Sequence, residues 1–161
     1  MLSQRPGLRP VREADRAFLI SLYRETRDDL AALALPPAAL TQMLEMQFDA
    51  QTQSYERGFP GHHWDIILHR DTPVGQIRVL RGTDEFVAID LSLLAASRGR
   101  GIGSHLLRNL QHEARTAGLP LKLSVEHRNT RARALYDRLG FVAVKDLGAH
   151  LAMCWPPTAG P

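Results

Sequence analysis

The sequence predicts one α/β (α+β) domain, in which a mixed, mostly antiparallel central sheet has helices on both faces. Three observations lead to this prediction. The length of 161 residues suits a single domain. In the middle of the chain, short apolar strands follow one another across tight turns, as in antiparallel hairpins. In the second half, apolar strands alternate with amphipathic helices, as in crossover connections. The expected order is β-α-α-β-β-β-α-β-α-β-β.

The first part of the chain is expected to form one weak strand and two helices. The strand covers residues 7–11, where Pro10 permits only a place at an edge or a strand end. A helix is predicted over residues 13–27, because apolar side chains recur there at helical spacing. A second helix opens at residues 36–37, since proline is tolerated in the first turn, and runs to about Tyr55.

Three strands are expected next, at residues 64–69, 74–80 and 85–94. Turn residues at 71–73 and 81–84 separate them. The third strand is nearly continuous in apolar residues, which is typical of a central strand buried on both faces.

The remaining elements are predicted as a helix at 105–117, a strand at 121–125, a helix starting near 129, and strands at 141–145 and 150–155. Gly118 and Gly140 stand where helices commonly end, and Asn129 or Thr130 can cap the second helix. The domain is therefore expected to span residues 1–155, followed by a disordered tail at 156–161.

The most informative stretch is Ser-Arg-Gly-Arg-Gly-Ile-Gly-Ser at residues 97–104, between the central strand and the next helix. A helix N-terminus carries unpaired N–H groups and partial positive charge, so it binds anions. Glycine allows close approach, and Arg98 and Arg100 add donors suited to phosphate. A P-loop is excluded because the stretch has no lysine, and the dinucleotide fingerprint fails because Ser104 occupies its last glycine position.

Two motifs in this region resemble those of the GNAT superfamily of N-acetyltransferases. Arg98-x-x-Gly101-x-Gly103 is similar to the loop that binds the acetyl-CoA pyrophosphate. Farther on, the pattern N-x-x-A-x-x-L-Y-x-x-x-G-F, which runs from Asn129 to Phe141, resembles the second motif of that family. The resemblance covers about residues 87–142. One departure is an alanine at position 95, where the family often has proline.

The resemblance implies acetyl-CoA as co-substrate and a sheet whose two central strands splay apart behind a bulge. The pantetheine arm would pair with the exposed strand backbone at Leu91 and Leu93, and Asn129 would contact that arm. The pyrophosphate-binding residues implied are Arg98, Gly99, Arg100, Gly101, Ile102, Gly103 and Ser104. Tyr136 would contact the donor and act catalytically, by giving a proton or hydrogen bond to the departing thiolate.

The general base stays open among Asp90, Glu126 and His127. Positions where family members often carry a carboxylate hold Val87 and Ser124 here, which favours a base that acts through water. The acceptor is expected to be a primary amine of a small molecule or peptide. The first two helices and the loops near residues 62 and 146 would bind it.

Composition limits the other classes of function. The net charge is +3 and hydrophobic residues make up 44% of the chain, which suits a small polyanionic ligand. A nucleic-acid binder would use arginines 98, 100, 128, 131 and 133, but few aromatic residues accompany them.

The histidines show no zinc-binding spacing, so no metal is expected. The single cysteine indicates a reducing, cytoplasmic location, and no apolar run is long enough to span a bilayer.

Two further alternatives remain at this stage. The chain could be a CoA-binding sensor or interaction module without transfer activity, or it could use a different acyl-CoA donor. The sequence does not give the oligomeric state, but a homodimer is compatible with the resemblance, because dimers are common in that superfamily.

Overall fold

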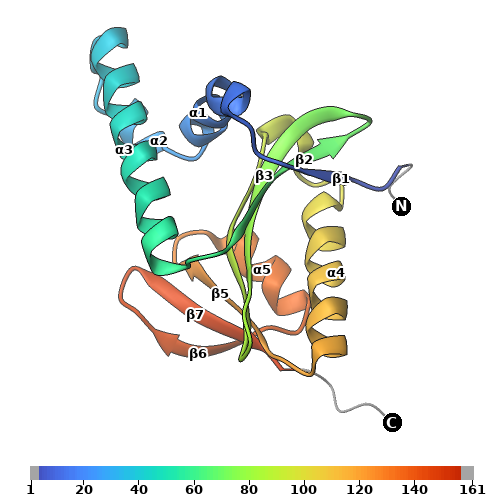
Figure 1. Ribbon diagram of the computed structural model, residues 1–161. Coiled ribbons are helices and arrows are strands. Elements are labelled where there is room, and N and C mark those ends of the chain that lie inside the picture. The colour runs from blue at the N-terminus through green and yellow to red at the C-terminus, as the bar shows by residue number, and fades with distance from the viewer. Residues whose placement is uncertain (1–3, 157–161) are drawn as a thin grey trace.

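The computed structural model describes residues 4–156, and it contains one seven-stranded sheet flanked by helices (Figure 1). The strand order is β1-β2-β3-β4-β5-β7-β6. The strands are β1 (Gly7–Pro10), β2 (His63–His69), β3 (Thr72–Arg81), β4 (Phe86–Leu93), β5 (Leu121–Glu126), β6 (Val142–Asp146) and β7 (His150–Trp155). The predicted tail, apart from Pro156, lies outside the described residues.

Neighbouring strands pair antiparallel except for β4 and β5, which run parallel. The prediction of a mixed, mostly antiparallel sheet is therefore confirmed. The helices are α1 (Arg16–Glu25), α2 (Asp28–Ala31), α3 (Pro37–Gly58), α4 (Ile102–Ala117) and α5 (Thr130–Arg138), with short 3-10 helices η1 (Glu13–Asp15) and η2 (Ala95–Ser97). The short α2 was not predicted.

Two apolar clusters show that the helices cover both faces of the sheet. Leu19 of α1 and Phe48 of α3 pack on Ile66 of β2. On the other face, apolar side chains of α4 and α5 join the main core, which includes Ile67, the neighbour of Ile66 on β2. Successive residues of a strand point to opposite faces, so the two helix pairs lie on opposite sides of the sheet. Figure 1 shows α3 and α4 at opposite sides of the view.

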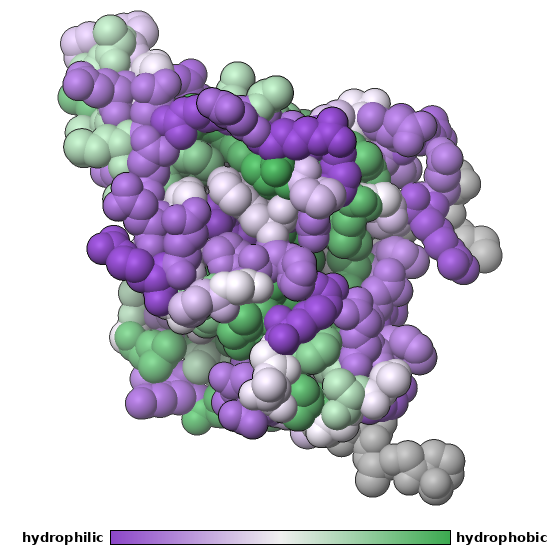
Figure 2. All heavy atoms as spheres, viewed as in Figure 1, coloured by the Kyte–Doolittle hydropathy of each residue, from purple (hydrophilic) through white to green (hydrophobic). Residues whose placement is uncertain are grey.

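Helix α4 forms because its sequence is amphipathic and its ends are marked by glycine. Leu106, Leu107 and Leu110 are buried along one side, and hydrophilic side chains cover most of its outer side, at the right of Figure 2. It starts at Ile102, three residues before the predicted start. The last residues of the glycine-rich stretch therefore form its first turn. At its other end Gly118 adopts a positive φ of 70°, as a C-terminal cap requires.

The two central strands start side by side and then part. Parallel pairing joins Phe86–Ala88 of β4 to Leu121–Leu123 of β5. On the other side of β4, Arg78 lies opposite Asp90 and Val79 lies opposite Ala88, so Ile89 is the extra residue of a bulge. Within the described part of the chain, residues 89–93 of β4 have no partner on β5. The predicted splay is thus confirmed, and it opens the sheet at its centre.

Candidate active site

A cleft of about 1220 Å³ occupies the space where β4 and β5 diverge. Its walls are formed by β4 and β5, by the start of α4, by helices α3 and α5, and by the segment that joins α1 to α2. It brings together almost all the predicted site residues: Leu91, Leu93, Arg98, Gly99, Gly101, Ile102, Gly103, Ser104, Asn129 and Tyr136. Arg100 is exposed and lies outside this lining.

The backbone geometry where the cleft meets the start of α4 favours binding of an anion. Gly99 and Gly101 have φ angles of 71° and 83°, a backbone conformation that favours glycine. Gly101 is the N-cap of α4, and its carbonyl accepts the first intrahelical bond from His105 N at 3.0 Å. None of residues 102–104 is acidic. Their N–H groups, together with the helix dipole, are suited to bind an anion such as a phosphate group.

The arginines near the start of α4 have different surroundings. The Nε of Arg98 donates to the Leu93 carbonyl at 3.0 Å, which ties the glycine-rich loop to the end of β4. A guanidinium nitrogen of Arg131 lies 3.0 Å from the point that a Cβ on Gly99 would occupy, and Arg131 also lines the cleft. Sequence reasoning did not assign Arg131 to this site. Its position in the first turn after the Asn129 cap was the available signal.

Asn129, one of the two residues that the sequence offered as a cap, is the N-cap of α5. Its Oδ1 accepts a hydrogen bond from Ala132 N at 3.1 Å, and the residue lines the cleft. The cap fixes the start of α5, and this helix in turn carries Tyr136.

Tyr136 also lines the cleft, with its ring packed edge-on against Phe141 at a centroid distance of 5.8 Å. Burial, with a further contribution from the charge of Asp90, raises the pKa of Tyr136 to about 12. The phenol is therefore protonated at neutral pH and can act only as a hydrogen-bond or proton donor toward an anion.

Among the three residues proposed as the base, the structure distinguishes Asp90. Its carboxylate lines the cleft and accepts a hydrogen bond from Gln76 Nε2 at 2.9 Å. Burial raises the pKa of Asp90, which makes this carboxylate a better proton acceptor. Glu126 also lines the cleft but accepts from Arg128 Nε at 2.7 Å. His127 pairs with Asp146 at 3.0 Å, outside the cleft lining.

The expected acceptor wall is partly different in the structure. The end of α1, the start of α2 and helix α3 line the cleft, through residues that include Tyr23, Asp28 and Tyr55. His62 instead contacts Arg78 at 3.2 Å, and Asp146 contacts His127. Neither His62 nor Asp146 is among the cleft-lining residues.

A polar layer lies behind Asp90 on the α3 side of the sheet. Trp64 of β2 donates to Gln76 of β3, and Gln76 donates to Asp90 and Ser92 of β4. Sequence reasoning named Asp90 as a candidate base but did not include Gln76. The signal was the alternation of Gln76 and Arg78 with apolar residues in β3.

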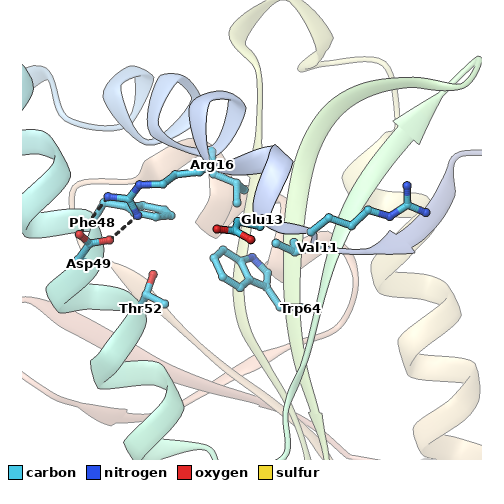
Figure 3. Close-up of a pocket in the computed structure, with 9 residues that line it drawn as sticks. Val11, Glu13, Arg16, Phe48, Asp49, Thr52 and Trp64 are labelled. Carbon is cyan, nitrogen blue, oxygen red and sulfur yellow. Dashed lines mark hydrogen bonds and ion pairs between the residues drawn. The ribbon is translucent and has the colours of Figure 1, made fainter.

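A second, smaller hollow of about 420 Å³ lies between η1, α1, α3 and β2 (Figure 3). Arg16 and Asp49 already form a two-pronged ion pair there, with N–O distances of 2.7 and 3.0 Å. The indole of Trp64 forms one wall. Trp64 therefore lines this hollow and also begins the polar layer that reaches Asp90.

Two other classes of site are not found within residues 4–156. That part of the chain holds no group of three or more His, Cys, Asp or Glu side chains placed to bind a metal ion. None of its helices combines the length and the apolar character needed to cross a membrane.

Comparisons with known proteins agree with this geometry. The model of the acetyltransferase (GNAT) family matches residues 20–141. The fold is similar to PaiA N-acetyltransferase from Thermoplasma acidophilum, solved with coenzyme A: the TM-score is 0.70 and the identity 16%, over 95% of this chain and 99% of that one. An acetyltransferase from Thermus thermophilus gives a TM-score of 0.67 at 22% identity, over 97% and 99%.

A third solved structure, the ribosomal-protein-S18-alanine N-acetyltransferase from Escherichia coli, gives a TM-score of 0.65 at 16% identity, over 97% and 96% of the two chains. Among curated proteins, none matches the sequence.

Proposed function

The chain belongs to the GNAT family of acetyltransferases, which use acetyl-CoA, and we propose that it moves the acetyl group directly to a primary amine of a small molecule or peptide. The splayed cleft is the observation that carries this proposal. Its lining combines the N-terminal end of α4, which favours anions, with Asp90 as a proton acceptor and Tyr136 as a proton donor.

The donor would lie along the unpaired edge of β4. The pyrophosphate would accept hydrogen bonds from the N–H groups of residues 99–104, with charge from Arg98, Arg100 and Arg131. The pantetheine arm would extend between β4 and β5 and pair with the backbone at Leu91 and Leu93. Such pairing satisfies backbone groups that the splay leaves open.

The chemical step needs one proton acceptor and one proton donor. Asp90 takes a proton from the acceptor ammonium, directly or through a water, which gives a neutral amine. The amine nitrogen attacks the thioester carbonyl, a C–N bond forms and the C–S bond breaks. Tyr136 donates its phenolic proton or a hydrogen bond to the departing thiolate. As the amide forms, the attacking nitrogen releases its second proton, which restores the Tyr136 phenol, and Asp90 gives its own proton to solvent. The products are the acetylated amine and CoA.

Acetyl-CoA should stabilise the folded protein. At about 100 times Kd, a ligand that binds only the folded state adds about 2.7 kcal/mol, which raises Tm by about 5 to 10 °C. Differential scanning fluorimetry measures this shift, with inorganic pyrophosphate as the control for simple anion binding. A shift no larger than that given by pyrophosphate would contradict the proposed binding mode.

Transfer itself is tested with a panel of small amines, amino acids and short peptides, and release of the CoA thiol is followed. Thiol release that depends on one amine class identifies the acceptor. Binding without thiol release from any amine would favour the alternative, a CoA-binding sensor. Acyl-CoA donors of different chain length, assayed with the best amine, separate acetyl transfer from transfer of a larger acyl group.

The helix-terminus site is tested by the Gly101→Ala variant. Alanine in a left-handed conformation costs about 1–2 kcal/mol, so the loop shifts or stays strained. We expect the Kd for acetyl-CoA to rise about tenfold, measured by isothermal titration calorimetry. Gly118→Ala is the matched control, because it puts the same strain at the other end of α4. Equal effects of the two variants on Kd would refute an anion site at residues 99–104.

The remaining expectations belong to the same proposal. The protein acts as one domain over residues 1–155 in the cytoplasm, where a single cysteine stays reduced. A homodimer is expected from the family, and light scattering after size-exclusion chromatography tests it.

A further inference from the structure

We propose that Gln76 is a positioning residue: held in one orientation by Trp64, it fixes the Asp90 carboxylate at the cleft and keeps it ready to accept a proton. This inference rests on the proposed function, in which Asp90 is the base. It concerns two residues, on β2 and β3, that neither the family motifs nor the cleft lining includes.

The orientation of the Gln76 amide follows from its partners. An indole N–H can only donate, so the oxygen of Gln76 must face Trp64, where the Nε1–Oε1 distance is 2.9 Å. The NH₂ group of Gln76 then faces β4. It donates to Asp90 Oδ2 at 2.9 Å and to Ser92 Oγ at 2.8 Å. Gln76 is only 5% exposed, so water does not compete for these bonds.

Trp64 is itself held rigidly. The guanidinium of Arg78 stacks over its ring, 3.5 Å from the centroid, and the ring of Phe48 lies 6.3 Å from it. Arg78 in turn donates to Thr52 at 3.1 Å and contacts His62. The indole therefore cannot turn without breaking the stack, and the direction of its N–H group is set before substrate binds.

Several charged or titratable groups act on Asp90 besides Gln76. Arg78 on β3 attracts its negative charge, and the Leu91 N–H group hydrogen-bonds it. Tyr55 on α3 and Tyr136 on α5 both feel its charge. Burial raises the pKa of Asp90 and the Gln76 bond lowers it. Loss of the bond would therefore make the ionised, proton-accepting form harder to reach.

The test is the pH dependence of kcat/KM in Gln76→Leu. The acidic limb should move to higher pH by about one unit or more, because a hydrogen bond to a charged group is lost. The Kd for acetyl-CoA should stay as in the wild type. Trp64→Phe keeps the aromatic stack but removes the N–H donor, so the Gln76 amide can flip, and a smaller shift in the same direction is expected.

A second variant keeps the test valid if Gln76→Leu does not fold. Gln76→Glu can still accept from Trp64, but it places a second carboxyl group beside Asp90. Two neighbouring carboxyl groups cannot both ionise easily, so the acidic limb again moves to higher pH. Ile66→Val is the control, because it disturbs packing on the same face without touching the Gln76 bonds. It should lower Tm and leave the limb in place.

An NMR titration of isotope-labelled aspartate carboxyl groups separates failure of this inference from failure of the proposed function. It follows the pKa of Asp90 without turnover. If that pKa is the same in wild type and Gln76→Leu, or if the kcat/KM limb moves equally in Ile66→Val, the inference is wrong. If the pKa moves as expected while no amine is acetylated, the positioning role stands and the proposed function fails.

Discussion

Replacement of Tyr136 by phenylalanine should lower kcat by about two to three orders of magnitude and leave the Kd for acetyl-CoA nearly unchanged. The variant loses only the hydroxyl group, while the ring can keep its edge-on contact with Phe141. Without that donor, negative charge that develops on the departing sulfur is no longer stabilised. Steady-state kinetics and calorimetry with acetyl-CoA separate the two effects.

The raised pKa of Tyr136, about 12, sharpens this expectation. At every pH used for an assay the phenol carries its proton, so the wild-type enzyme should show no basic limb from Tyr136 at neutral or mildly alkaline pH. A basic limb near neutral pH would have to come from another group.

Tyr55→Phe is the matched control, since it removes the hydroxyl of a second half-buried tyrosine that lines the same cleft. Tyr55 lies on α3, on the side proposed for the acceptor. Its loss should act mainly on KM for the amine. If Tyr55→Phe and Tyr136→Phe reduce kcat equally, the effect does not belong to the leaving thiolate, and the role given to Tyr136 is wrong.

The elements around the donor site were predictable because local signals mark them. An apolar strand, a glycine-rich stretch and an amphipathic helix closed by Gly118 lie in one continuous segment, residues 86–118. The turn at Gly99 and Gly101 requires positive φ, which favours glycine over other residues. The position of the turn can therefore be predicted from its glycines.

The polar layer was harder to predict because it depends on strand register. Strict alternation along β4 would put Asp90 on the same face as Phe86 and Ala88, in the core. The bulge at Ile89 reverses the faces, so that Leu91 packs on the core and Asp90 faces Gln76 instead. No residue pattern in this apolar strand marks the position of the bulge. The hydrogen bonds that depend on the bulge also join three different strands, so they could not be predicted from one segment of sequence.

The contact between Arg131 and the glycine-rich loop was missed for a similar reason. Residues 99 and 131 are far apart in the chain, and the packing of α5 beside the start of α4 brings them together. Helical periodicity predicts which side of α5 is apolar. It does not predict that Arg131, in the first turn of α5, lies next to Gly99.

Asp90→Asn carries the second large expected effect, and it acts on activity and stability in opposite directions. Asparagine has nearly the same shape and can still accept a hydrogen bond from Gln76 Nε2, but it cannot take a proton from the acceptor ammonium. We expect kcat/KM to fall by about two orders of magnitude or more. The acidic limb of the pH profile assigned to Asp90 should disappear as well.

The Asp90→Asn variant should be more stable against unfolding than the wild type, although it is less active. Because burial raises the pKa of Asp90 above its ordinary value of 3.8, the folded state binds this proton more tightly than the unfolded state does. As pH rises from the pKa of Asp90 in the unfolded state to its higher pKa in the folded state, ionisation of Asp90 destabilises the wild type. This loss of stability is complete once pH exceeds the folded-state pKa. Asparagine never ionises, so the variant avoids it, while Arg78 keeps its contacts with Thr52, His62 and Trp64.

Thermal unfolding of both proteins between about pH 3 and about pH 8 measures this difference. The Tm of Asp90→Asn should exceed that of the wild type at the alkaline end. The gap should close toward the acidic end, where Asp90 is mostly protonated in both the folded and unfolded states. A gain in stability together with a loss of turnover is the behaviour expected of a buried group retained for chemistry. A variant less stable than the wild type at the alkaline end, or one with unchanged kcat/KM, would show that Asp90 serves the fold and not the reaction.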